Sequence, residues 1–249
     1  MTSLNQLYQI CGQDNVIDNP QLTNPYTTDW RKRYHGSAIA VVFPRAQSQI
    51  QELVKFCQVQ QIAIIPQGGN TSTCGAATPL SDYNKPQLIV NLQKMNKIIS
   101  LDRDNYSLTV EAGCTLQQVQ DYASVHGLYF PLSLASQGSC QIGGNLATNA
   151  GGVQVLKYGM IRDLTLGLRA VLANGEVLDG LTALRKDNTY LDLKQLLIGS
   201  EGTLGIITHA TLKLFPMPPA YCTLMFPVNS IAQALQLLQQ LKTYYTNNV

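Results

Sequence analysis

Charged residues are scarce in this sequence. Asp, Glu, Lys and Arg make up 13% of the 249 residues, which is about half the share usual in globular proteins. The net charge is only +2 and Lys and Arg form no run, which argues against a dedicated nucleic-acid-binding protein. With so few charges, we expect much of the polar surface to face a ligand or another protein.

Cysteines and histidines at metal-binding spacings are also missing. The three histidines, His35, His126 and His209, form no HxxxH motif and lie far apart, so the sequence predicts no metal site. The cysteines form no CxxC motif, which favours free, buried thiols in a reducing cytoplasm over a set of disulfides. They are Cys11, Cys57, Cys74, Cys114, Cys140 and Cys222.

Targeting and membrane-spanning segments are not visible in the sequence. The N-terminal stretch MTSLNQLYQICGQDN has neither the basic nor the apolar segment of a secretory signal. No apolar run approaches the roughly 20 residues that a membrane helix needs. The longest run, at 38–43, suits a buried strand. We therefore expect a cytoplasmic protein without a membrane span.

Two common nucleotide-binding motifs are absent as well. No GxGxxG opens a helix after a strand, and no GxxxxGK[ST] occurs. These absences argue against an NAD-type Rossmann domain and against a P-loop ATPase.

Helix patterns recur along the chain without an internal repeat. In the stretch 44–58 apolar residues fall at helical spacing, and Ser48 with Gln51 predicts a capping box at the start. Thr115 and Gln118 predict the same motif before a second helix. Both helices should therefore bury one apolar face.

Strand patterns lie between and after these helices. Short apolar or alternating runs predict strands at 62–66, 88–92, 106–113 and 204–216. Within 166–180, Asn174-Gly175 predicts a hairpin with a type I′ turn. This order predicts an α+β fold rather than a regular βαβ repeat.

The sequence changes in character after FPMPP (215–219). A strand is predicted over 221–228, followed by an amphipathic helix capped by Ser230. A lone strand and helix cannot bury both of their faces. We interpret residues 220–249 as the first strand–helix unit of an incomplete second domain.

Three glycine-rich loops are the most unusual feature, and they cover 67–76, 136–152 and 199–205. Each adjoins a predicted strand, so together they could present many backbone N–H groups to one anion. A pyrophosphate suits such a cradle, because peptide dipoles can meet its charge without lysines. The first loop indeed contains no Lys or Arg. The alternative is that the loops are ordinary tight turns.

Four long motifs resemble a known family. PQGGNTSTCGAATP, GSCQIGGNLATNAGG, LKYGMIRDLTLGLRAVLANGEVLDG and LRKDNTYLDLKQLLIGSEGTLGIIT resemble the FAD-linked oxidases of the vanillyl-alcohol oxidase type. Within that family they are most similar to the D-2-hydroxyacid dehydrogenases, which include the D-2-hydroxyglutarate and D-lactate enzymes and the glycolate oxidase flavin subunit. The resemblance implies a PCMH-type FAD-binding domain of two α+β subdomains at 34–219, after an N-terminal extension at 1–33.

The resemblance also implies where FAD binds. The pyrophosphate would lie against Pro66, Gly68, Gly69, Asn70, Thr71 and Ser72. The ribityl chain and flavin ring would lie against Pro131, Leu132, Gly138, Ser139, Gly143, Gly144, Thr148, Asn149 and Gly151. The adenosine side would be held by Glu201, Gly205, Ile206 and Ile207. The glycines would then let a flat ring and a charged linker lie on bare backbone.

The sequence departs from the family pattern at several positions. Asn70 stands where some members carry a His that tethers FAD, which implies non-covalent FAD. Cys140 lies near a position that forms a thioether in other relatives, and we expect a packed thiol there instead. Ser72, Tyr190 and Leu191 replace Gly, Gly and Tyr of the hydroxyglutarate-type pattern. A tyrosine at a position of positive φ would strain the backbone and could crowd the flavin.

The activity implied by the resemblance is the oxidation of a D-2-hydroxy acid to a 2-oxo acid by hydride transfer to the flavin. Family members place the substrate arginines, the catalytic histidine and, in the hydroxyglutarate type, metal-binding histidines in a cap domain that these 249 residues do not include. We therefore assign no catalytic residue and no metal ligand. We expect an FAD-binding chain that is inactive or weakly active alone. The alternatives are a non-catalytic fragment or subunit whose cap is on a second polypeptide, and a flavin reductase fed by a nicotinamide.

Overall fold

Helices and strands alternate along the chain, whose computed structural model describes residues 3–220 and 222–245. The helices are α1 (Ser3–Cys11), the 3-10 helix η1 (Gln13–Asn15), α2 (Pro20–Thr27), α3 (Gln47–Gln60), α4 (Leu116–Val125), α5 (Ile142–Ala147), α6 (Val155–Tyr158), α7 (Lys194–Leu197) and α8 (Ile231–Tyr245). The strands are β1 (Val16–Ile17), β2 (Ala40–Val42), β3 (Ala63–Gln67), β4 (Gln87–Asn91), β5 (Ile98–Asp102), β6 (Ser107–Glu111), β7 (Leu128–Tyr129), β8 (Thr165–Leu172), β9 (Val177–Gly180), β10 (Gly205–Lys213) and β11 (Phe215–Pro216). The predicted α+β class is confirmed.

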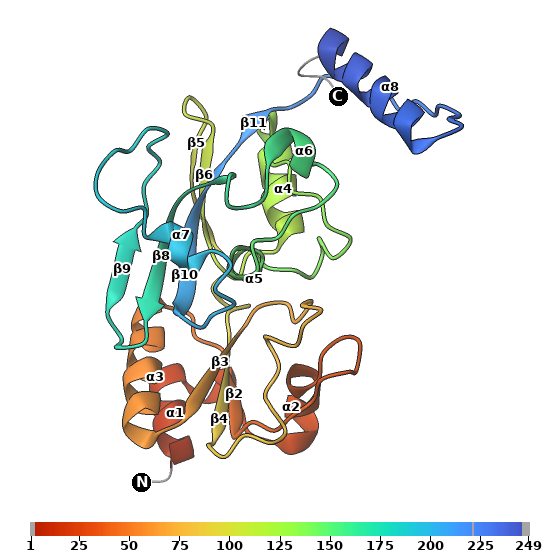
Figure 1. The fold of residues 1–249 in the computed structure, drawn as a ribbon. Coiled ribbons are helices and arrows are strands. Elements are labelled where there is room, and N and C mark those ends of the chain that lie inside the picture. The colour runs from red at the N-terminus through yellow and green to blue at the C-terminus, as the bar shows by residue number, and fades with distance from the viewer. Residues whose placement is uncertain (1–2, 221, 246–249) are drawn as a thin grey trace.

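The first sheet has the strand order β1-β2-β4-β3, and its last three strands run parallel. β4 is buried throughout because helices cover both faces of the sheet. Val42 and Val90 face the side of α1 and α3, whereas Val41 and Ile89 pack on the side of Tyr26 from α2. Figure 1 shows this sheet between α3 and α2.

The N-terminal segment packs into this first sheet. β1 pairs with β2, and Leu7 of α1 is completely buried in the main core. Asn70 reaches back to the end of α2, where its amide donates to the carbonyl of Thr28 at 2.8 Å. The described part of residues 1–33, which the sequence set apart as an extension, is therefore integral to this half of the molecule.

The second sheet is antiparallel, with the strand order β5-β6-β10-β8-β9. β10 lies at its centre and pairs with both β6 and β8. α4 begins at the predicted capping box, in which the Thr115 hydroxyl accepts from the Gln118 backbone N–H at 3.1 Å. His126 caps the end of α4 and His209 lies in β10.

Three local predictions were wrong. α3 begins after Ala46 without a side-chain cap from Ser48, and the Gln49 side chain accepts from the Arg45 N–H instead. The hairpin between β8 and β9 exists, but only Gly175 of the Asn174-Gly175 pair has positive φ. The Gly175 N–H donates to Leu172 at 2.9 Å, which gives a type I turn followed by a glycine bulge.

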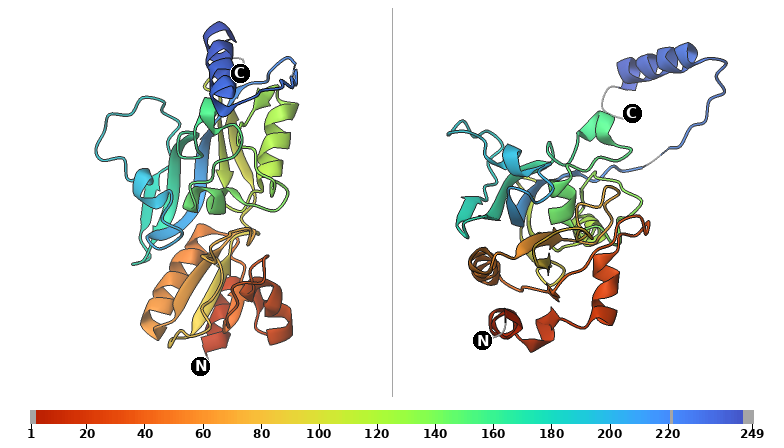
Figure 2. Two further views of the ribbon diagram at one scale, coloured as in Figure 1. Left: turned by 45° about the vertical axis from the view of Figure 1, so that its right-hand side comes forward. Right: turned by 60° about the horizontal axis from the view of Figure 1, so that its bottom comes forward.

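The third wrong prediction concerns the last segment. Residues 222–228 form no strand, because no sheet edge lies beside them to complete the hydrogen bonds; Tyr221 lies outside the described residues. The predicted helix is present as α8, and the Ser230 hydroxyl accepts from the Gln233 N–H at 3.2 Å. Its apolar Ile231 is 82% exposed. Figure 2 shows α8 held away from both sheets on an extended connection.

Candidate functional site

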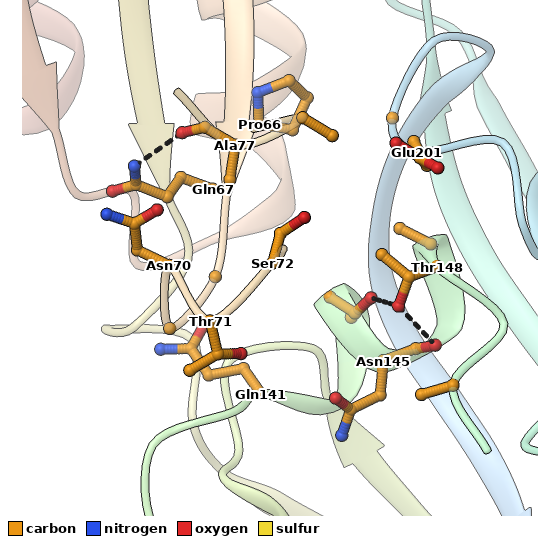
Figure 3. A pocket seen from close by; sticks show the side chains of 18 of the residues that line it. Pro66, Gln67, Asn70, Thr71, Ser72, Ala77, Gln141, Asn145, Thr148 and Glu201 are labelled. Atoms are coloured by element: carbon orange, nitrogen blue, oxygen red, sulfur yellow. Dashed lines mark hydrogen bonds between the residues drawn. The ribbon is translucent and has the colours of Figure 1, made fainter. Parts of the chain in front are cut away.

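The three glycine-rich loops meet around one cavity of about 470 Å³. The first loop (67–76) follows β3, the second loop (136–152) contains α5, and the third loop (199–205) leads into β10. In Figure 3 Thr71 and Ser72 of the first loop lie across the opening from Thr148 and Glu201. The cavity therefore lies where the two halves of the molecule adjoin.

Most of the residues assigned from the resemblance line this cavity. They are Pro66, Gly68, Gly69, Asn70, Thr71, Ser72, Gly143, Gly144, Thr148, Gly151, Glu201, Gly205, Ile206 and Ile207. The remaining five, Pro131, Leu132, Gly138, Ser139 and Asn149, are not in the lining. Leu132 is buried in the core, and Gly138 and Ser139 lie on an exposed turn.

A buried polar pair that the sequence reading missed holds the base of the first loop. The Gln67 amide donates to the carbonyls of Tyr26 and Ala77, both at 2.8 Å. The Asn91 amide donates to the Gln67 side chain at 3.0 Å and to the Gly68 carbonyl at 3.1 Å. Both side chains are almost fully buried at the ends of β3 and β4. In the sequence, Gln67 and Asn91 each stand as a polar residue at the end of an otherwise apolar run. That pattern could have indicated a buried, hydrogen-bonded side chain.

Close packing between chain segments explains some of the glycines. A Cβ on Gly69 would overlap the Ser139 carbonyl oxygen, so the first and second loops touch through their backbones. A Cβ on Gly143 would stand 2.7 Å from the Ala112 Cβ. At Gly144, by contrast, no described atom lies within 4 Å of the Cβ position. Gly144 thus leaves bare backbone facing the cavity.

The third loop is fastened to the second. The backbone N–H groups of Gly199 and Glu201 donate to the carbonyls of Leu146 and Ala147, at 3.0 and 2.8 Å. The Arg162 guanidinium donates to the carbonyls of Gln195 and Ile198, which fixes the segment before the loop. These contacts place the start of β10 against α5.

The cavity has little charge of its own. No Lys, Arg or His belongs to its described lining, and Glu201 is the only carboxylate. The Cys74 thiol lies 3.7 Å from a Glu201 carboxylate oxygen. The backbone N–H groups of Gly68 through Thr73 donate no hydrogen bond within the described chain. The site therefore offers an anion a row of backbone donors rather than side-chain cations.

A second, largely apolar cavity of about 400 Å³ adjoins the first. The two share Pro66, Gly202, Gly205 and Ile206. Val54, Ile62 and Val171 are among its other walls. An anion-binding cavity that continues into an apolar one suits a ligand with both a phosphate and a flat ring.

Other chemistry is not apparent in the described residues. Among them no three His, Cys, Asp or Glu side chains are grouped to hold a metal ion. Nor is any described helix both long and apolar enough to cross a bilayer. All six cysteines are free; Cys74 and Cys222 are exposed and the other four are buried. Cys140 packs beside Asn145 at 3.5 Å and does not line the cavity.

Comparison with known proteins agrees with this geometry. Residues 38–180 match a family model described as an FAD binding domain. A mitochondrial D-2-hydroxyglutarate dehydrogenase of Arabidopsis thaliana is 42% identical over 84% of this chain and 36% of its own length. The Bos taurus enzyme of that name is 41% identical, over 89% of this chain and 40% of its own length. A D-2-hydroxyglutarate–pyruvate transhydrogenase of Saccharomyces cerevisiae is 34% identical, over 94% of this chain and 47% of its own length.

Solved structures show the same fold. An alkyldihydroxyacetonephosphate synthase structure superposes with a TM-score of 0.82 at 24% identity, over 98% of this chain and 45% of that chain. The chain thus spans less than half the length of these relatives.

One prediction is overturned by the comparison, and one is confirmed. The expected cytoplasmic location is wrong, because similar D-2-hydroxyglutarate dehydrogenases are named as mitochondrial enzymes. The family resemblance read from the motifs is confirmed, since the family model covers 38–180, more than half of the chain. The chain belongs to the FAD binding domain family, and its relatives include dehydrogenases named for D-2-hydroxyglutarate and D-lactate.

Proposed function

We propose that this chain binds FAD non-covalently in the cavity of the three loops and forms the flavin-binding part of a D-2-hydroxyacid dehydrogenase. FAD is the cofactor of the family to which the chain belongs. The substrate class is inferred from the relatives named as D-2-hydroxyglutarate dehydrogenases. The observation that carries the proposal is the row of unpaired N–H groups from Gly68 to Thr73 at the edge of the cavity.

The cavity residues fit the parts of FAD. The pyrophosphate would accept hydrogen bonds from the first-loop amides, which need no countercharge. The bare backbone at Gly144 would let a flat group lie close to α5. The Glu201 carboxylate is an acceptor for ribose hydroxyls, and the adjoining apolar cavity suits an adenine ring.

Asn70 supports non-covalent binding. Its amide group is used in the hydrogen bond to the Thr28 carbonyl, and an amide is no nucleophile toward the flavin. Cys140 is 2% exposed and is not in the lining, so it offers no second attachment point. We therefore expect acid precipitation to release all of the FAD.

The proposed reaction removes two electrons and two protons from the hydroxy acid. When bound, FAD would supply the two-electron acceptor for the hydride that leaves the α-carbon, while the hydroxyl proton goes to a base and the 2-oxo acid forms. This chain's own loops would orient the cofactor and exclude water from one side of it. Its described cavity lining contains no basic side chain for a substrate carboxylate and no histidine as a base.

We propose further that the chain binds FAD without turning over the substrate by itself. The missing groups would come from a cap domain, which a second polypeptide could supply. In support, none of the residues of α8 is buried, and the helix stands away from both sheets (Figure 2). In this proposal residues 34–219, with the N-terminal segment that packs into their first sheet, form the FAD-binding domain, and residues 220–249 form the start of the cap.

The test is to purify the chain, add FAD, remove the excess and record the visible absorbance. We expect a yellow protein whose FAD is displaced by ADP and is released by acid. Under anaerobic conditions, D-2-hydroxyglutarate and D-lactate should leave the colour unchanged. Colourless protein would refute FAD binding. Rapid bleaching would refute only the proposal that the chain does not turn over the substrate by itself.

A further inference from the structure

We propose that the side-chain oxygen of Gln141 accepts a hydrogen bond from a hydroxyl group of bound FAD, one of those on the sugar or sugar-alcohol carbons that flank the pyrophosphate. The inference deepens the proposed function and rests on FAD binding in this cavity. It gives a role to a residue that neither the motif match nor the glycine pattern singled out.

The Gln141 side chain is a buried polar group without a partner. It precedes α5 as the N-cap residue, is 6% exposed and lines the cavity. Its Oε1 atom is fully buried and accepts no hydrogen bond within the described chain. Buried acceptors of this kind are rare in folded proteins, because the oxygen has lost its water without gaining a donor. Such an atom in a ligand cavity is explained by a donor on the ligand.

The neighbouring amide groups are already engaged. The Asn145 amide donates to the Cys140 sulfur at 3.5 Å. The Asn91 amide donates to the Gln67 side chain and to the Gly68 carbonyl. Both N–H groups of the Asn91 amide are therefore used, and so is one of the two on Asn145.

The position of Gln141 selects the kind of donor. Its Oε1 lies 3.3 Å from the Cβ position of Gly68, so the side chain reaches the start of the row of free first-loop amides (Figure 3). A pyrophosphate placed on those amides has only acceptor oxygens and cannot donate to the Gln141 Oε1 atom. The groups directly beside it are hydroxyl-bearing on both sides, the ribose of the adenosine and the ribityl chain of the flavin. A hydroxyl from one of them is the donor that the chemistry allows.

The decisive variant is Gln141→Met, which keeps the length of the side chain and removes the oxygen. The matched control is Gln137→Met, on an exposed residue of the same loop outside the lining. We expect Gln141→Met to raise the dissociation constant of FAD about tenfold, since a ligand hydroxyl loses its acceptor. The melting temperature of the FAD-free protein should stay the same or rise, because an unpaired buried oxygen has been removed. Gln137→Met should change neither quantity.

A second variant and two ligand fragments locate the hydroxyl. Gln141→Asn withdraws the amide from the first loop by one methylene and should also weaken FAD binding. ADP contains the ribose and FMN contains the ribityl chain, so the fragment whose affinity falls in Gln141→Met identifies the donor. Weaker binding of either fragment supports the proposal.

Three results would overturn it. Unchanged FAD affinity in Gln141→Met would exclude the hydrogen bond while leaving the proposed function intact. A fall of several degrees in the melting temperature of the FAD-free variant would show a structural role instead. Failure of the unmodified chain to bind FAD would remove the proposed function and this inference together.

Discussion

Seven of the described residues other than glycine have positive φ, and three of them lie in the glycine-rich loops. Asn70, Asn149 and Glu201 have φ of +51°, +46° and +52°, and each belongs to one of the three loops. Left-handed conformations are uncommon outside glycine, and Asn tolerates them best. Asn70 and Glu201 also line the cavity, and strained residues are expected where a binding site dictates the backbone.

Tyr190 is one of the four that lie outside these loops. Its φ is +55°, as the family's glycine at this position implied, but its side chain is fully exposed and does not line the cavity. The expected crowding of the flavin therefore has no basis in this geometry. We predict that Tyr190→Gly raises the free energy of unfolding by up to about 1 kcal/mol, measured by urea denaturation, and leaves FAD affinity unchanged.

Leu191→Gly provides the comparison for this prediction. Leu191 is also exposed but does not have positive φ, so a glycine there adds only chain entropy to the unfolded state. It should leave stability the same or lower it. Equal effects of the two substitutions would show that the strain at Tyr190 is not released by glycine.

At the residue scale, the sequence predicted the loops better than the contacts within them. Glycine-rich loops beside strands and the matching motifs indicated which stretches meet, and most of the assigned residues do line the cavity. Pro131 and Leu132 are exceptions, and Leu132 packs into the core instead. Gln67, Asn91 and Gln141 were missed because their roles depend on partners 10 to 73 positions away or on a ligand, and no local pattern marks such residues.

At the scale of elements, Gly69 of the first loop and Gly144 of the second differ in what an added methyl group would meet. We predict that Gly69→Ala destabilises the protein by about 1–3 kcal/mol, because the new methyl group would overlap the Ser139 carbonyl. Gly144→Ala should instead stabilise the FAD-free protein by up to about 1 kcal/mol, since it improves a helical position and meets no atom. It should nevertheless weaken FAD binding by filling the space beside α5.

Both variants are compared by thermal unfolding without FAD and by FAD titration. We expect Gly69→Ala to lower the melting temperature of the FAD-free protein and Gly144→Ala to raise it. If Gly144→Ala bound FAD as tightly as the unmodified chain, the cofactor would not approach α5 at this position.

Elements with a local signal were predicted well, whereas those that depend on partners were not. The capping box at Thr115 and the apolar run of β4 are local, and both were found. The cap expected at Ser48 is replaced by Gln49, because the N-terminal segment packs beside α3 and the Gln49 amide also donates to the Ile10 carbonyl at 2.9 Å. The strand expected over 221–228 failed because a strand requires a neighbouring strand, which composition does not reveal.

For the whole molecule, the buried thiols predict how stability depends on pH. Burial raises the pKa of the Cys11, Cys57 and Cys114 thiols to about 12 from the ordinary 9.0. Above pH 9 the unfolded chain therefore releases these protons while the folded chain retains them. The unfolded state then binds fewer protons, so the free energy of unfolding should fall as pH rises from 9 toward 12.

Urea denaturation at a series of alkaline pH values measures this fall, and Cys57→Ala isolates one contribution to it. The variant should be less stable at neutral pH because it leaves a small cavity. Its stability should decrease less steeply above pH 9 than that of the unmodified chain. Identical slopes would show that this thiol ionises equally well in both states.

The shared core of the two halves has a consequence for how a nucleotide enters. Leu7 of α1, Val90 of the first sheet, Leu108 of the second sheet and Leu214 near β11 all belong to one continuous set of buried side chains. Swinging the halves apart on a hinge would expose that set to water, at a cost that grows with the apolar area uncovered. We therefore expect the two halves to keep their relative positions while the cofactor enters.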